Sequence, residues 1–225
     1  MLKKNKLLVI EDCAEAIGSY YKNKHAGCFG DAAAFSFFGN KTITTGEGGM
    51  LAFKKREYFE KAKILRDHGM SPKKRYWHIS VGFNYRMTNL QAAIGLAQLE
   101  NIKKILKKKL LISNIYKKHL INNKSIIIPK IEKNYKNRYW FFIIKIKNGN
   151  SFIRDNLMNY LKNRNIETRT TFYPLNTMKI YKKFSNGKYK TSKEFFDSII
   201  CLPTWVKIQK KEIIRICKIL NEFYT

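Results

Sequence analysis

The sequence predicts an α/β protein that carries a second, smaller α+β domain. Three observations support this prediction. Short apolar runs near the start are typical of buried strands, an amphipathic pattern from Thr88 to Leu120 predicts a long helix, and strands and helices follow one another from about Ser125. We therefore expect a first domain at residues 1–122, which includes the long helix, and a second domain at residues 123–225.

The first part of the chain is expected to contain three strands. Leu7–Glu11 is a continuous apolar run that ends in acids, which is typical of a fully buried parallel strand. The remaining elements expected before residue 70 are a short helix, two more strands and a helix that Gly69 ends: Ala14–Tyr21, Ala32–Phe37, Met50–Phe53 and Lys55–His68.

A long loop and a capped helix follow. Met70–Arg86 is aromatic and aperiodic, and a loop of this length inside a compact domain is usually functional. Thr88 and Gln91 have the spacing of a capping box, so the long helix is expected to begin there. The second part should contain two strands and three helices: Tyr139–Ile146, Ser151–Asn163, Glu167–Phe172, Ser192–Ile199 and Gln209–Phe223.

The formal net charge of +29 has two interpretations. A nucleic-acid binder would need such charge. However, the lysines are spread along the whole chain, arginines are few and no recognised nucleic-acid motif accompanies them, which favours drift of the composition toward Lys, Ile and Asn. We therefore expect no nucleic-acid partner, and a basic nucleic-acid-binding protein is the less favoured alternative.

The composition also limits location and metal chemistry. No apolar run reaches the 18 residues of a membrane span, and the apolar stretch after the basic start is too short for a signal peptide. The four cysteines form no CxxC pair and have no histidine at metal-ligand spacing. These observations predict a cytoplasmic protein with reduced thiols, without a metal site and without a membrane partner.

The strongest chemical signal is Lys41. Ser36 ends the second apolar strand and Lys41 follows it at the spacing Ser-x-x-x-x-Lys, while Asp12 ends the first strand. These residue types suit pyridoxal 5'-phosphate, because a lysine can bind its aldehyde, a serine can bind its phosphate and an aspartate can keep its pyridine nitrogen protonated. Open α/β sheets also bind ligands at the carboxyl ends of their strands.

Each of these residues has an alternative interpretation. Lys41 could be one surface lysine among many, and Ser36 a core serine bonded to backbone. Asp12 could be the N-cap of the helix expected after it, with Glu15 completing a capping box. Asn84 could be only a turn residue before the long helix.

Several motifs together resemble those of the DegT/DnrJ/EryC1/StrS family of nucleotide-sugar aminotransferases, which depend on pyridoxal phosphate. The residues that carry the resemblance are VIEDCAEAIG at 9–18, GCFGDAAAFSFFGNKTITTGEGG at 27–49, RDHGMS at 66–71, YWH at 76–78 and GFNYRMTNLQAAIGLAQLE at 82–100. Tyr173-Pro174-Leu175 and Leu202-Pro203 are similar to the family's C-terminal domain. The resemblance covers nearly the whole chain and implies an aspartate-aminotransferase-like fold, with part of a large mixed-sheet domain and a small α+β domain.

The resemblance implies a role for each candidate residue. Lys41 would bind the cofactor covalently and move the proton, and Asp12 would pair with the pyridine nitrogen. Glu15 would lie near the ring hydroxyl, and Ser36 would bind the phosphate. Asn84 would reach the phosphate of the neighbouring subunit, because sites of this family lie at a homodimer interface.

The resemblance also narrows the expected substrate. Lysine at position 41, where a dehydratase branch carries histidine, favours amino transfer. The block Arg66–Glu100 is most similar to the branch that uses glutamate to aminate C4 of GDP-4-keto-6-deoxymannose, which yields GDP-perosamine for surface polysaccharide such as lipopolysaccharide O-antigen.

Family members carry a substantial portion before the strand that ends at Asp12. We therefore expect an N-terminally truncated enzyme, which a separate N-terminal half could complete, or else a non-catalytic remnant.

Overall fold

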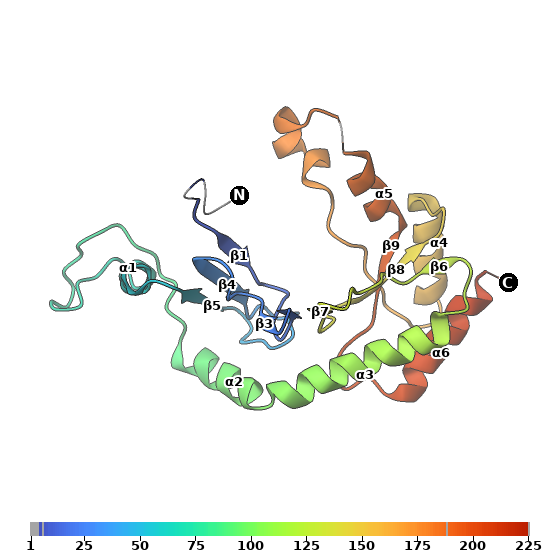
Figure 1. Ribbon diagram of the computed structural model, residues 1–225, viewed down its shortest axis with the longest axis horizontal. Coiled ribbons are helices and arrows are strands. Elements are labelled where there is room, and N and C mark those ends of the chain that lie inside the picture. Colours follow the sequence, from blue (N-terminus) through green and yellow to red (C-terminus); the bar gives the residue numbers. More distant parts are fainter. Residues whose placement is uncertain (1–4, 6, 188, 225) are drawn as a thin grey trace. The chain divides into compact units, whose positions relative to one another are not determined.

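The computed structural model describes residue 5, residues 7–187 and residues 189–224 (Figure 1). These residues divide into two compact units. Unit 1 comprises Met1–Leu106 and Glu132–Trp140, and unit 2 comprises Lys107–Ile131 and Phe141–Thr225. The chain thus passes from unit 1 to unit 2 twice, and the segment 132–140 returns to unit 1 in between. The domain boundary expected at residues 122–123 stays a prediction.

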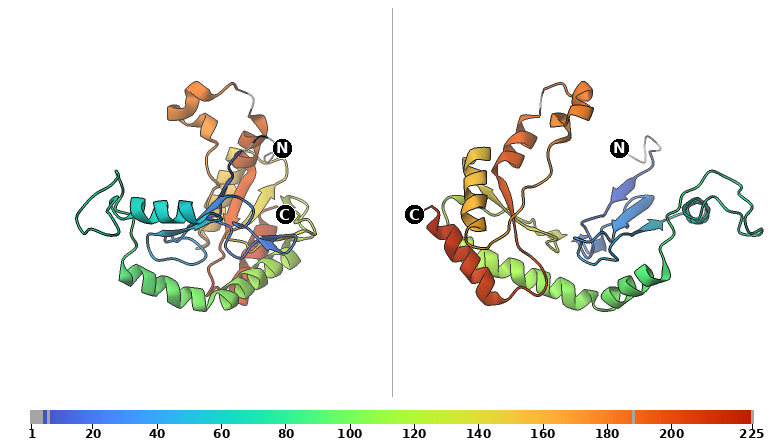
Figure 2. Two further views of the ribbon diagram at one scale, coloured as in Figure 1. Left: turned by 60° about the vertical axis from the view of Figure 1, so that its left-hand side comes forward. Right: turned by 180° about the vertical axis from the view of Figure 1, so that it is seen from behind.

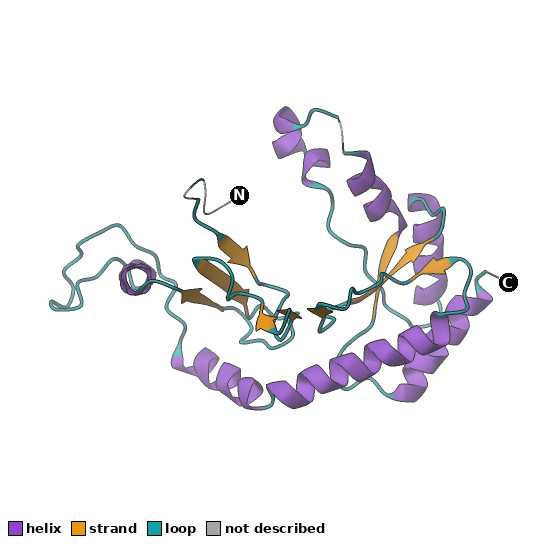
Figure 3. Cartoon of the chain, viewed as in Figure 1, coloured by secondary structure: helices purple, strands orange, loops and turns teal. Residues whose placement is uncertain are grey.

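Among its described residues, unit 1 contains two three-stranded sheets and two helices, and α3 begins at its end. Figure 3 distinguishes the helices, strands and loops by colour. The elements of unit 1, in chain order, are β1 Ile10–Asp12, β2 Tyr20–Tyr21, β3 Lys24–His25, β4 Ala32–Ser36, β5 Gly49–Phe53, α1 Arg56–Arg66, α2 Asn89–Glu100, α3 Ile102–Leu120 and β7 Tyr135–Lys136.

The first sheet has the strand order β1-β4-β5, and both views in Figure 2 show these strands side by side. β1 runs parallel to β4, whereas β5 runs antiparallel to β4, so the sheet is mixed. The predicted strands at Ala32–Phe37 and Met50–Phe53 are confirmed as β4 and β5. The expectation of a fully buried first strand is wrong, because β1 lies at an edge of this sheet and the side chain of Ile10 is 76% exposed.

The helix predicted at Ala14–Tyr21 is also wrong. Turns follow β1, and β2 pairs antiparallel with β3 in a hairpin. Lys22 and Asn23 at its tip both have positive φ, which is the geometry of a type I′ turn. Gly18 stops any helix before the hairpin, because its φ is +76° and a Cβ there would lie 2.4 Å from a methyl carbon of Leu106.

The predicted helix start at Thr88 is confirmed as a complete capping box. Thr88 Oγ1 accepts a hydrogen bond from the backbone N–H of Gln91, and the Gln91 side chain accepts one from the backbone N–H of Thr88. The long helix predicted from there is interrupted, since α2 ends at Glu100 and α3 begins at Ile102. The intervening Asn101 donates its side-chain amide to the carbonyl of Ala97, which competes with continuation of the helix.

Unit 2 has a three-stranded sheet in the order β6-β8-β9, together with helices. Its elements beyond α3 are β6 Ile126–Ile127, β8 Phe142–Ile146, α4 Ser151–Lys162, η1 Leu175–Thr177, η2 Lys179–Phe184, α5 Lys190–Ser198, β9 Ile199–Leu202 and α6 Lys210–Glu222. The helices predicted at Ser151–Asn163, Ser192–Ile199 and Gln209–Phe223 are confirmed within a few residues as α4, α5 and α6. The strand predicted at Tyr139–Ile146 begins later, at Phe142.

The strand predicted at Glu167–Phe172 is wrong. Only Arg169 pairs, through two backbone hydrogen bonds with Cys201. The chain then reaches Pro174, which lacks an N–H and restricts the backbone of the residue before it. β9, which the sequence pattern did not reveal, occupies the position beside β8 with all four residues buried.

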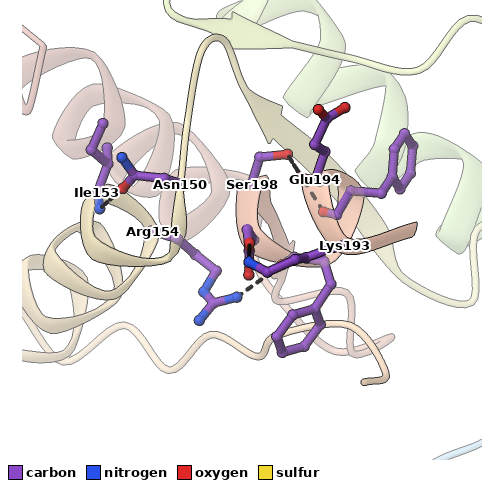
Figure 4. Close-up of polar contacts among 9 residues, drawn as sticks. Asn150, Ile153, Arg154, Lys193, Glu194 and Ser198 are labelled. Carbon is purple, nitrogen blue, oxygen red and sulfur yellow. Dashed lines mark hydrogen bonds and ion pairs between the residues drawn. The ribbon is translucent and has the colours of Figure 1, made fainter. Parts of the chain in front are cut away.

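Polar contacts fix the helices of unit 2 (Figure 4). The Asn150 side chain caps α4 by accepting the N–H of Ile153 at 3.0 Å. The buried Arg154 guanidinium donates to the carbonyl of Phe196 on α5 at 2.8 Å. On α3, Lys109 Nζ donates to Thr204 Oγ1 at 3.3 Å.

Candidate functional site

The candidate site lies in unit 1, at the end of the first sheet where the carboxyl ends of β1 and β4 meet. The two strands are parallel, with Asp12 opposite Ala34, so Asp12 and Ser36 both lie at their carboxyl ends. The parallel pairing therefore places these two residues at the same end of the sheet, and their binding roles stay predictions. This is the edge at which open α/β sheets place ligands.

Asp12 is exposed, in contrast to the buried acid expected at the end of a buried strand. Its Oδ1 accepts the backbone N–H of Ala14 at 3.1 Å, a local turn contact rather than a helix cap. With no helix after it, the alternative of a capping box between Asp12 and Glu15 is wrong. The Asp12 carboxylate therefore remains accessible to a ligand.

Glu11 has a different surrounding, because successive residues of a strand point to opposite faces. Its carboxylate accepts the backbone N–H groups of Gly27, Phe29 and Gly30 at 2.7, 2.6 and 2.5 Å. Burial opposes ionisation of this carboxyl, but the three hydrogen bonds and the charge of Lys54 outweigh it and hold the pKa of Glu11 below its usual 4.5. Glu11 thus fixes the turn before β4.

Lys41 lies in a turn that begins immediately after β4. The Lys41 N–H donates to the carbonyl of Phe38 at 3.0 Å. The Phe37 N–H donates to the carbonyl of Gly48, and the Phe37 carbonyl accepts the N–H of Thr45, both at 2.9 Å. The turn is closed at its base, so the position of Lys41 relative to β4 is set by backbone bonds.

Helix α2 supports this turn from outside. Gln98 accepts the N–H of Thr44 at 3.2 Å and donates its side-chain amide to the Thr44 carbonyl. Gln91, at the start of the same helix, donates to the carbonyl of Glu47 at 3.2 Å. The capping box of α2 is therefore coupled to the loop that carries Lys41.

The amine of Lys41 has two neighbours. Its Nζ lies 3.4 Å from Glu15 Oε1 and 4.0 Å from the centre of the Trp140 ring. The Lys41 side chain is 13% exposed, whereas that of Glu15 is 45% exposed. The structure thus brings Lys41 and Glu15 together, a contact that the sequence analysis did not predict, and the alternative of an ordinary surface lysine does not describe a side chain this enclosed.

Trp140 is the contact that the sequence interpretation missed. Its indole N–H donates to the carbonyl of Asn40 at 2.7 Å, across 100 positions of sequence. The segment that carries it is anchored in unit 1, because β7 pairs antiparallel with β2. No local motif links Trp140 to Lys41, so only the fold reveals their contact.

Ser36 and Asn84 have different surroundings. Ser36 is half-buried, and its hydroxyl oxygen accepts the N–H of Phe38 at 3.3 Å. Asn84 is exposed and its backbone forms a bridge with Asp67, in the loop between α1 and α2. Among the contacts of the described residues, none joins Asn84 to Lys41, and its role at a neighbouring subunit stays a prediction.

Two general features bear on the chemistry. Among residue 5 and residues 7–187 and 189–224, no group of three or more His, Cys, Asp or Glu side chains could hold a metal ion. No helix in the same part of the chain is long and apolar enough to cross a membrane.

The fold, with its lysine beyond the carboxyl edge of a mixed sheet, is that of the α/β aminotransferases. Residues 1–221 match the DegT/DnrJ/EryC1/StrS aminotransferase family, and the chain belongs to this family. The expectation of an α/β, aspartate-aminotransferase-like fold is confirmed by the similarity to PseC of Helicobacter pylori, an aminotransferase involved in the biosynthesis of pseudaminic acid. PseC is 27% identical, with a TM-score of 0.92 over 99% of this chain and 61% of that chain.

Curated relatives are more similar in sequence. The chain is 41% identical to the GDP-perosamine synthase of Escherichia coli O157:H7 over 100% of its own length and 60% of the relative's. It is 40% identical to the GDP-perosamine synthase of Vibrio cholerae over 97% of its own length and 59% of the relative's. The chain therefore spans about three fifths of the length of these relatives.

Proposed function

We propose that this chain is the lysine-bearing part of a pyridoxal phosphate-dependent aminotransferase that acts on a nucleotide-linked 4-keto-6-deoxy sugar. The observation that carries the proposal is the enclosed Lys41 amine beyond the carboxyl edge of β1 and β4. Family membership over residues 1–221 supports the same reaction class.

The residues at this edge fit the chemistry of pyridoxal phosphate. Asp12 offers an exposed carboxylate to the pyridine N–H, and Ser36 a half-buried hydroxyl to the phosphate. Lys41 offers its amine to the aldehyde, and Glu15 is adjacent to it. When bound, the cofactor supplies an electron sink for the carbanion that amino transfer requires.

The surroundings of Lys41 suit a group that must bind an aldehyde and also move a proton. Glu15 is nearly half exposed, so water screens its ion pair with Lys41. Exposed ion pairs of this kind contribute only about 0–1 kcal/mol to stability. Lys41 can therefore leave Glu15 at little cost. The backbone bonds of the turn keep its Cα in place while the amine moves.

We further propose the substrate and the assembly. Glutamate would be the amino donor and GDP-4-keto-6-deoxymannose the acceptor, because GDP-perosamine synthases are the relatives at 41% and 40% identity. The enzyme would be a homodimer in which Asn84 serves the neighbouring subunit.

The lysine assignment is tested by borohydride reduction in the presence of limiting pyridoxal phosphate, followed by peptide mapping. The chain is tested alone and together with the N-terminal portion of a GDP-perosamine synthase. We expect the pyridoxyl group on Lys41, its loss in Lys41→Arg and its retention in Lys54→Arg, since Lys54 is an exposed lysine of the same unit. Preferential labelling of another lysine would contradict the assignment.

The substrate is tested in the same reconstituted enzyme with glutamate. We expect turnover of GDP-4-keto-6-deoxymannose in preference to UDP- or dTDP-linked 4-keto sugars. A preference for either of those would leave the reaction class in place and overturn the choice of sugar.

A further inference from the structure

Trp140 contacts both Lys41 and the residue before it, although it lies far along the chain. We propose that Trp140 is a positioning residue that holds the Lys41 amine in place for reaction. The inference rests on the proposed function of Lys41, and its geometry involves unit 1 alone.

The indole makes two different contacts. Its N–H donates to the Asn40 carbonyl at 2.7 Å, which fixes the peptide immediately before Lys41. Its ring face lies 4.0 Å from Lys41 Nζ, well within the range of a cation–π interaction. One side chain thus restrains both the backbone and the amine of the same lysine.

Trp140 restrains Lys41 more strongly than Glu15 does. Glu15 is 45% exposed, so solvent screens its attraction for the amine. Trp140 is only 8% exposed, and a cation–π contact strengthens when water is excluded from it. Because a free lysine side chain samples many rotamers, a buried aromatic face that selects one of them orders the amine before a ligand arrives.

The backbone before Trp140 is held in an uncommon conformation that supports this role. Tyr139 has φ +52°, a left-handed geometry that costs energy for a bulky residue. One local and one long-range bond hold this segment: Asn137 Oδ1 accepts the Tyr139 N–H at 2.8 Å, and Arg138 Nε donates to the Gly18 carbonyl at 2.9 Å. The segment therefore presents Trp140 rigidly.

The test measures how fast Lys41 reacts with trinitrobenzenesulfonate in the chain without cofactor, relative to exposed Lys54 in the same sample. In Trp140→Leu we expect the ratio to rise about fivefold, because the amine loses a cation–π contact and its cover. Trp140→Phe keeps an aromatic ring but loses the indole N–H, so its ratio of Lys41 to Lys54 reactivity should lie between those of the wild type and Trp140→Leu. Trp77→Leu is the matched control, since Lys74 lies 4.4 Å from that exposed ring and Lys41 should be unaffected.

An unchanged Lys41 ratio in both Trp140 variants would overturn the proposal. Far-UV circular dichroism verifies folding, and if Trp140→Leu does not fold, Trp140→Phe decides with an expected rise of about twofold. In the reconstituted enzyme Trp140→Phe should lower kcat and leave KM for the sugar unchanged, and a changed KM with unchanged kcat would also overturn it. The labelling needs no cofactor, so a raised ratio without pyridoxyl labelling of Lys41 would refute the proposed function alone.

Discussion

Lys109 on α3 has its ammonium buried in unit 2, with the residue 6% exposed, and this makes the stability of the chain sensitive to alkaline pH. Burial lowers the pKa of Lys109 from 10.5 to about 8. Between these two values the unfolded chain binds more protons than the folded chain. The free energy of unfolding therefore rises with pH in this window.

The magnitude follows from the two pKa values. Keeping Lys109 charged in the folded state costs about 3 kcal/mol at pH 7, about 2 kcal/mol at pH 9 and about 1 kcal/mol at pH 10. Lys109→Met removes this cost together with the polar contacts of the ammonium, which include the hydrogen bond to Thr204, and we take their loss as about 0.5–1.5 kcal/mol. We expect the variant to be about 2 kcal/mol more stable than the wild type at pH 7, and this advantage to vanish by pH 10.

The assay is urea unfolding at 25 °C, followed by far-UV circular dichroism at pH 7, 8, 9 and 10 for both proteins. Groups that titrate in both proteins cancel in the difference between their unfolding free energies. Lys107→Met is the control, because Lys107 is exposed two positions earlier on the same helix and its replacement should change stability by less than about 0.5 kcal/mol at every pH. If the difference in unfolding free energy between Lys109→Met and the wild type stays constant from pH 7 to pH 10, the reasoning is refuted.

Three further predictions concern unit 1. Asp12→Asn retains an oxygen that can accept the N–H of Ala14, so the fold should stay intact. We expect kcat in the reconstituted enzyme to fall about 10- to 100-fold. Activity equal to that of the wild type would show that Asp12 has no part in the mechanism. Glu11→Gln should cost about 1.5–3 kcal/mol at pH 7. Because the folded-state pKa of Glu11 is lowered, its contribution to stability is present above pH 4.5 and is lost as the pH falls through the folded-state pKa. Urea unfolding should therefore show that the difference in unfolding free energy between the wild type and Glu11→Gln narrows in acid. Thr88→Ala should cost about 1 kcal/mol through loss of the capping box, and an unchanged unfolding midpoint would contradict this.

Elements with a strong local signal could be predicted from the sequence. The capping box at Thr88 and Gln91 determines where α2 begins through contacts three residues apart. The apolar run of β4 and the glycine-rich turn after Lys41 are similarly local. Lys41 and Ser36 could be proposed because their spacing spans one strand end and one turn.

Features that lack the usual local signal, or that depend on distant partners, could not be predicted in this way. The hairpin at Lys22 and Asn23 has neither glycine nor the usual Asn-Gly pair, although both residues have positive φ. The exposure of Ile10 depends on which elements cover the sheet rather than on its apolar character. Trp140 is one aromatic residue among many until pairing between β7 and β2 brings its segment to unit 1.

The return of segment 132–140 to unit 1 has a consequence for synthesis of the chain. The turn that carries Lys41 is translated early, but its aromatic neighbour arrives only after the ribosome has also produced all of α3. The surroundings of Lys41 therefore close through a long-range contact that is formed late, and such contacts slow folding. A protease cut in the connection between α3 and β7 would likewise leave Lys41 and Trp140 on different polypeptides, held together by β-pairing and side-chain contacts alone.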